Sequence, residues 1–170
     1  MNISKYLIVS LSFIACYYAS NLQAMEPHQQ QGPRTPIDKL LTAIGRKDLN
    51  AVKEAVEKDK APLSYAGKTT FAFGPPLADA VQEGNMSIVK YLLSRGAPVN
   101  EPNRWGQRPL SIAISQDRED IVQALLEAGA NPNLASSGVP RDLTPLEYAK
   151  QYNRPNQQII VQMLQKHGAR

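Results

Sequence analysis

Two stretches of the chain carry the same order of apolar and polar positions. Residues 76–97 and 109–130 each begin with Pro-Leu, continue through two amphipathic segments joined by a short polar link, and end in Gly-Ala. Equivalent residues of the two stretches lie 33 positions apart. A fixed period of this size is typical of repeats that stack on one another. The pattern therefore predicts two helical hairpins of the same design.

The flanking stretches carry weaker forms of this pattern. Apolar residues in 37–44 recur at intervals of three and four, as on one face of a helix, and a second helix is predicted over 49–58. Thr144 and Glu147 have the spacing of a capping box, in which each side chain satisfies a backbone amide at the other residue. Pro155 is expected to begin the final helix, because proline cannot sit inside one. The outer copies have polar exteriors, as the end units of a stack require.

These motifs resemble the ankyrin repeat, whose pattern is roughly Thr-Pro-Leu-x-x-Ala, a glycine, Ile-Val-x-x-Leu-Leu and Gly-Ala. The resemblance covers about residues 35–170 and implies an all-α ankyrin-repeat solenoid of stacked helix-turn-helix units. Hairpin-like loops, here called fingers, are expected to project between the units. Copies one to four are expected at about 35–75, 76–107, 108–143 and 144–170.

Departures from the family pattern include three positions in the outer copies. Lys47 stands where the glycine between the two helices is expected, and Asp59 replaces the closing glycine of copy one. Gln165 occupies a position where leucine is usual. The central copies match the pattern more closely, so the fold assignment depends mainly on them.

The first 24 residues have the layout of a secretory signal peptide. A short start with one lysine precedes the apolar run 6–19, which is too short to cross a bilayer of ~30 Å as a helix. Cleavage is expected after Ala24, which implies a periplasmic or secreted protein with no membrane contact. Two alternatives remain open: an uncleaved anchor, or a lipoprotein in which Phe13-Ile14-Ala15-Cys16 serves as a lipobox and a lipidated Cys16 tethers a scaffold. The polar, Gln- and Pro-rich segment 25–34 is expected to be a disordered linker.

Composition excludes several functions. The net charge is +4 and the cationic residues do not cluster, so nucleic acid is not an expected partner. Cys16 is the only cysteine, so the chain after the leader can form no disulfide and has no thiol nucleophile or cysteine-metal site. The two histidines, His28 and His167, belong to no catalytic or phosphate-binding motif. We therefore expect no enzyme activity and no cofactor, although a small-ligand or catalytic role in a groove of the stack is an unfavoured alternative.

The resemblance implies that the protein binds another protein, as a monomer, through its fingers and the concave face of its first helices. A leader on an ankyrin protein is more familiar from bacteria, including host-associated ones, than from animals. The candidate partner-binding residues are Tyr65, Phe71, Phe73, Arg104, Trp105, Gln107 and Arg141 on the fingers, and Asp79, Gln82, Glu83, Gln116, Glu147 and Lys150 on the first helices.

Competing structural roles apply to several of these candidates. Phe71 and Phe73 lie in a connection about four residues longer than usual, and either form a contact surface or cover the end of the stack. Trp105 either binds the partner or packs against the adjacent finger while Arg104 is solvated. Asp79 and Glu83 lie four residues apart on one helix face, a spacing that favours a solvated face over a catalytic carboxylate pair.

Overall fold

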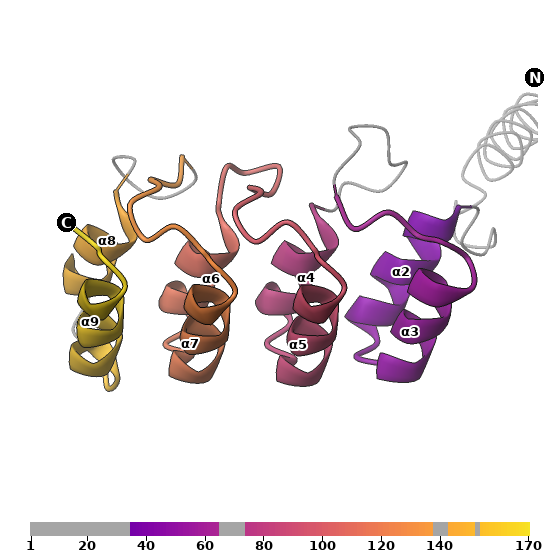
Figure 1. The fold of residues 1–170 in the computed structure, drawn as a ribbon, viewed down its shortest axis with the longest axis horizontal. Coiled ribbons are helices and arrows are strands. Elements are labelled where there is room, and N and C mark those ends of the chain that lie inside the picture. The colour runs from indigo at the N-terminus through magenta and orange to yellow at the C-terminus, as the bar shows by residue number, and fades with distance from the viewer. Residues whose placement is uncertain (1–34, 65–73, 138–142, 152–153) are drawn as a thin grey trace, which may run out of the picture. The chain divides into compact units, whose positions relative to one another are not determined.

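The computed structural model describes residues 35–64, 74–137, 143–151 and 154–170, which belong to one compact unit, Pro33–Arg170. In these ranges the chain is helical, and no strand occurs. The helices form four antiparallel pairs that stand in a row (Figure 1). They are α2 (Pro36–Gly45) with α3 (Leu49–Glu57), α4 (Pro76–Gln82) with α5 (Met86–Ser94), α6 (Pro109–Ser115) with α7 (Glu119–Glu127), and α8 (Pro145–Gln151) with α9 (Gln157–Lys166). The predicted all-α repeat solenoid is confirmed.

Each pair packs on the next through apolar residues at the repeat period. The first helices α2, α4, α6 and α8 contact one another in sequence, and the second helices do the same in a parallel row. Leu77, Ile88 and Leu92 of copy two are fully buried, as are Ile121 and Leu125 of copy three. A helix pair standing alone would expose these side chains to water. Burial therefore depends on neighbouring pairs and favours their stacking.

Reciprocal capping boxes begin α2 and α8, and the one predicted at Thr144 and Glu147 is confirmed. Thr35 Oγ1 accepts from the backbone N–H of Asp38 at 3.3 Å, and the Asp38 carboxylate accepts from the backbone N–H of Thr35 at 3.1 Å. Thr144 and Glu147 form the same reciprocal box, with 2.8 Å between the Thr144 amide and Glu147 Oε2. The Thr144 amide and hydroxyl both lower the pKa of Glu147, because they stabilise its ionised form.

The turn between the two helices of a pair uses a left-handed residue in the first three copies. Gly84 has φ of 66°, whereas Lys47 and Asp117 adopt 58° and 56° at the equivalent positions. A residue with a Cβ pays a steric penalty there, which glycine avoids. The departure from the family pattern at Lys47 thus leaves the backbone geometry unchanged.

Two sequence predictions about helix ends are wrong. The closing left-handed residue of copy one is Lys60, with φ of 55°, and not Asp59. Copy one has one additional residue before Ala61. The Ala61 amide donates to the Ala55 carbonyl, six residues earlier, at 3.0 Å, whereas the equivalent bond of copy two joins Ala97 to Leu92, five residues earlier. Pro155 does not begin α9: it lies in a turn closed by the bond from the Gln157 amide to the Arg154 carbonyl, where its fixed φ suits the second turn position.

Side chains of one copy cap the first helix of the copy before it. Arg118 Nη1 donates to the Gly84 carbonyl at 2.8 Å, and Gln116 Nε2 donates to the Gln82 carbonyl at 2.8 Å. One copy later, Arg154 Nη1 donates to the Ile114 carbonyl at 3.3 Å. The last carbonyls of a helix have no partner within the helix and carry partial negative charge, so donors, and cationic donors especially, stabilise them.

We predict that Gly84→Ala lowers the free energy of unfolding by about 1–2 kcal/mol or more. The substitution strains a left-handed backbone, and its Cβ would lie 2.8 Å from Arg118 Nη1, which displaces the bond between copies. Gly45→Ala is the matched control, since nothing lies within 4 Å of the added Cβ at the end of helix α2. We expect the control to be neutral or to stabilise by up to about 1 kcal/mol. Equal effects of the two changes in urea unfolding would contradict the prediction.

Candidate functional site

The central finger, residues 98–108, is a rigid turn organised by the Asn103 side chain. Asn103 Oδ1 accepts from the backbone amides of Trp105 at 3.0 Å and Gln107 at 2.9 Å. The backbone amide of Asn103 donates to the Gln107 carbonyl at 2.8 Å, and the Gly106 amide donates to the Asn103 carbonyl at 2.9 Å. Asn103 is only 7% exposed, so these bonds are shielded from water. These bonds close a turn over residues 103–106 and fix the direction of the finger tip.

Trp105 and Arg104 occupy the tip of the central finger. Trp105 is 54% exposed, and Ile159 is the only other large hydrophobic side chain in the described ranges with such exposure. The Arg104 guanidinium lies over the Trp105 ring, 4.1 Å from its centroid. This cation–π contact holds two exposed side chains in one arrangement. The structure thus favours exposure of Trp105 over packing against the adjacent finger.

The central finger is anchored to the next finger and to copy two. The Ser137 amide donates to the Gly106 carbonyl at 3.1 Å, and Arg108 Nε donates to the Ala135 carbonyl at 3.0 Å. On the other side, a Cβ added to Gly74 would lie 2.7 Å from Asn103 Cβ, so the backbone of Gly74 packs directly on the finger. These contacts limit the motion of the tip relative to the helices.

Asp79 lies beside this anchor and is not solvated as the sequence suggested. The residue is half-buried, and its Oδ2 atom is shielded from water without a hydrogen-bond partner. The equivalent positions of copies three and four are buried too: they hold Ile112, which is 2% exposed, and Tyr148, which is 9% exposed. The pKa of Asp79 is raised from 3.8 to about 6, mainly by burial and to a lesser extent by the nearby charge of Glu83. The Gly74 amide and the charge of Arg104 act in the opposite direction and lower this pKa. Periodicity alone did not reveal this, because it placed Asp79 only on the exposed side of the helix.

The remaining candidates separate into exposed side chains and side chains used by the scaffold. Gln82, Glu83 and Lys150 are exposed on the first helices, and Glu83 pairs with Lys47 at 3.6 Å. Gln107 accepts from Asn103 Nδ2 at 3.2 Å, Gln116 caps α4, and Glu147 caps α8. Tyr65, Phe71, Phe73 and Arg141 lie outside the described residues. No interaction with a partner tests any of these candidates, which stay predictions.

Asn103 is the residue of the site that the sequence analysis did not single out. Its signal was present, because Asn followed three residues later by Gly is typical of a turn in which the Asn side chain bonds its own backbone. The sequence could not show that the same side chain would be buried between Gly74 and the tip.

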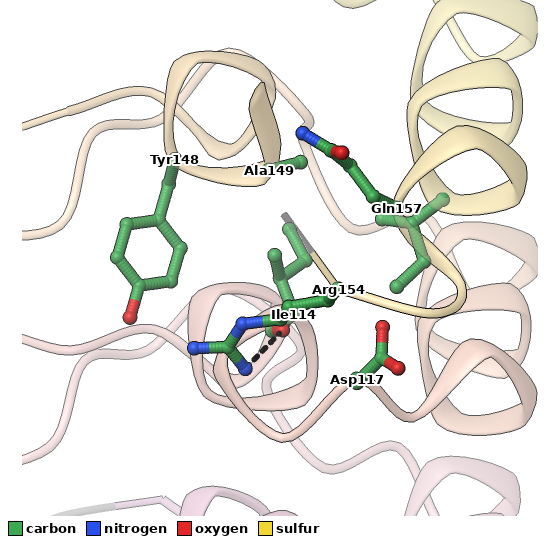
Figure 2. Close-up of a pocket in the computed structure, with 7 residues that line it drawn as sticks. Ile114, Asp117, Tyr148, Ala149, Arg154 and Gln157 are labelled. Atoms are coloured by element: carbon green, nitrogen blue, oxygen red, sulfur yellow. Dashed lines mark hydrogen bonds between the residues drawn. The ribbon is translucent and has the colours of Figure 1, made fainter. Parts of the chain in front are cut away.

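A small hollow lies between copies three and four (Figure 2). Ile114, Asp117, Tyr148 and Arg154 contribute to its wall, and Arg154 Nη1 donates to the Ile114 carbonyl across it. The space inside it that a water molecule could occupy is about 10 Å³. That is room for about one water molecule, so this hollow offers little support for a small-ligand or catalytic role.

In the described ranges, no three His, Cys, Asp or Glu side chains come together in a way that could hold a metal ion. No helix in those ranges is both long and apolar enough to span a bilayer.

We predict that Asp79→Asn changes the pH dependence of stability. The pKa of about 6 in the folded protein exceeds 3.8, so protonated Asp79 stabilises the fold; this contribution is complete below about pH 3.8 and is lost as pH rises through about 6. The variant should therefore be more stable than the wild type by about 1 kcal/mol at neutral pH, a value discounted for partial exposure, and equal to it near pH 4. Glu127→Gln, which removes an exposed carboxylate from helix α7, is the control. A pH-independent difference in urea unfolding would contradict the prediction.

Comparison with known proteins identifies the repeats. The family model described as "Ankyrin repeats (3 copies)" matches residues 38–136 and 77–170. Human protein phosphatase 1 regulatory subunit 27 is 31% identical over 118 residues, which cover 68% of this chain and 75% of that protein. Human Rabankyrin-5 is 32% identical over 96 residues, 47% of this chain. The chain spans less than a tenth of the length of the first curated relatives that it matches.

A solved structure supports the same assignment. It is the "Bd0816 Predatory Endopeptidase from Bdellovibrio bacteriovorus in complex with immunity protein Bd3460", one chain of which superposes with a TM-score of 0.63 at 28% identity. The match covers 76% of this chain and 63% of that chain. Ankyrin repeats generally mediate protein–protein interaction and are generally not catalytic, and the matched residues of this chain consist of such repeats. The chain belongs to the ankyrin repeat family.

Proposed function

We propose that this chain is a non-enzymatic, exported protein-binding module that captures its partner with the central finger and the exposed first-helix face. The observation that carries the proposal is the rigid presentation of Arg104 and Trp105 at the finger tip. Tryptophan and arginine are over-represented among residues that dominate binding energy. A tip already fixed by Asn103 loses little freedom on binding, so more of the contact energy contributes to affinity.

Export is the second part of the proposal. The support is the sequence of residues 1–24, with its basic start, apolar run and small residue at position 24. In this proposal the leader is cleaved after Ala24 during export, and the remaining protein is periplasmic or secreted. Lipidation at Cys16 is the alternative, in which the same module becomes a membrane-tethered scaffold.

A narrower version of this function is inhibition of an exported enzyme. The structural relative comes from a complex of an endopeptidase with an immunity protein. A rigid, projecting finger suits insertion into the cleft of a hydrolase, and the proposed leader would bring this chain into the compartment where secreted hydrolases act. We propose an enzyme of this kind as the first partner class to be tried.

We predict that Arg104→Ala combined with Trp105→Ala abolishes partner capture without lowering the melting temperature, because both side chains are exposed. The measurement is affinity capture of the tagged full chain, expressed in its source cells, followed by mass spectrometry and reconstitution with each purified partner. Lys90→Ala with Lys53→Ala is the matched control on the second-helix side, where both lysines are exposed. Unchanged capture by the finger variant would remove the central finger from the site.

If a captured partner is a hydrolase, loss of its activity on addition of this chain would support the inhibitor function, and unaltered activity would contradict it.

We predict that the mature protein begins at Met25. Mass spectrometry of the intact protein isolated from its source cells measures this directly. A lipid-modified Cys16 at the N-terminus would establish the tethered alternative. An intact Met1 in the membrane fraction would establish the uncleaved anchor, and a cytoplasmic location would contradict export.

A further inference from the structure

We propose that the central finger recognises a carboxylate of the partner that stands beside an apolar side chain, with Arg104 binding the carboxylate and Trp105 covering the apolar neighbour. This inference rests on the proposed function and adds the chemistry of the partner at that site. It follows from the geometry of the Arg104–Trp105 pair and from the charges around it.

The Arg104 guanidinium is held in a position suited to recognition. Its central carbon lies 4.1 Å from the Trp105 ring centroid, which places the guanidinium over the indole. In the described part of the chain, none of its N–H groups donates a hydrogen bond within the protein, whereas Arg108, Arg118 and Arg154 all donate to backbone carbonyls. Arginine presents its N–H groups in a planar fork that matches a carboxylate with two parallel bonds. Stacking on Trp105 reduces the freedom that Arg104 would lose on forming them.

The acidic neighbours of Arg104 do not satisfy its charge. Asp79 forms no ion pair with Arg104 within 4.0 Å, and the Gly74 amide stabilises its half-buried carboxylate. Glu83 pairs with Lys47 at 3.6 Å, and Glu101, in the finger itself, has an interaction of its own within the chain. Arg104 therefore remains the cation that the tip offers to a partner, and a carboxylate is its complement.

Trp105 determines what stands next to that carboxylate. Its ring is half-exposed in a turn that Asn103 fixes, so an apolar side chain docking on it would bury surface without rearrangement of the finger. A partner cation would instead have to displace Arg104 from the ring face. A nucleic acid would require several cations to neutralise neighbouring phosphates, and the described tip presents one.

Synthetic peptides test this chemistry directly. The probes are short peptides with one central Glu flanked by Leu and Phe, together with the same peptides carrying Gln or Lys in place of Glu. Trp105 is the only tryptophan of the chain, so its fluorescence in the full-length protein reports binding at this finger. We expect the Glu peptides to shift the emission saturably and to bind about tenfold or more tightly than the Gln peptides, as charge-assisted hydrogen bonds imply.

Variants separate the two side chains. Arg104→Gln should remove the preference for Glu over Gln, and Arg104→Lys should restore only part of it, because lysine keeps the charge without the fork. Lys90→Gln removes the same charge from the exposed second-helix side and should leave binding unchanged. Equal binding of Glu and Gln peptides, tighter binding of Lys peptides or of an oligonucleotide, or no saturable signal with the Glu peptides would each overturn the inference.

The natural partner distinguishes failure of this inference from failure of the proposed function. If Trp105→Ala abolishes capture while Arg104→Gln leaves it unchanged, the finger binds its partner without a carboxylate, and only the further inference fails. If neither change affects capture, the finger is not part of the site and both fail.

Discussion

The structure depends on apolar surface that no helix pair can bury by itself. Leu77 is fully buried and Leu110 is 3% exposed because each lies between its own pair and its neighbours. Burial of aliphatic side chains supplies the main stabilising free energy of such an array, at about 25 cal/mol for each Å² removed from water. Because every seam is shared, the position of one pair constrains the next. The packing between neighbouring pairs therefore also sets the spacing of the fingers.

Hydrogen bonds between copies add direction to this packing. At one side of the stack, Gln116 donates to the Gln82 carbonyl at the end of α4, and Arg118 donates to the Gly84 carbonyl in the turn that follows. At the finger side, Asn100 Oδ1 accepts from the Asn131 amide at 2.9 Å, and Asn133 Oδ1, one period later, accepts from the Arg170 amide at 2.9 Å. Apolar contacts tolerate small sliding movements, whereas these bonds require a defined register. The position of Arg104 and Trp105 relative to the first helices is therefore a property of the whole central stack.

The repeat period of the sequence predicted most of the helices. It did not predict the additional residue before Ala61 or the burial of Asp79. The helices of copies two and three follow directly from matching positions 33 residues apart, and the reciprocal bonds of Thr144 and Glu147 follow from their spacing. The additional residue before Ala61 could not be predicted, because lysine and aspartate both occur there and neither favours a left-handed backbone as glycine does. At the site, exposure of Trp105 was one of two equal interpretations. Asp79 lies beside Gly74, whose backbone packs on Asn103 of the following finger. A contact with that later segment could not be predicted from the local pattern around Asp79.

The hydrogen bond from Arg118 to the Gly84 carbonyl matches copy three to copy two in particular. The Arg118 guanidinium occupies space that exists only because position 84 lacks a side chain. Copy one has Lys47 at the corresponding place, so a hairpin with this arginine would not fit equally well behind it. Units that look interchangeable in an alignment are thus matched to particular neighbours. Duplication, deletion or transplantation of a single unit would therefore join surfaces that do not match in this way.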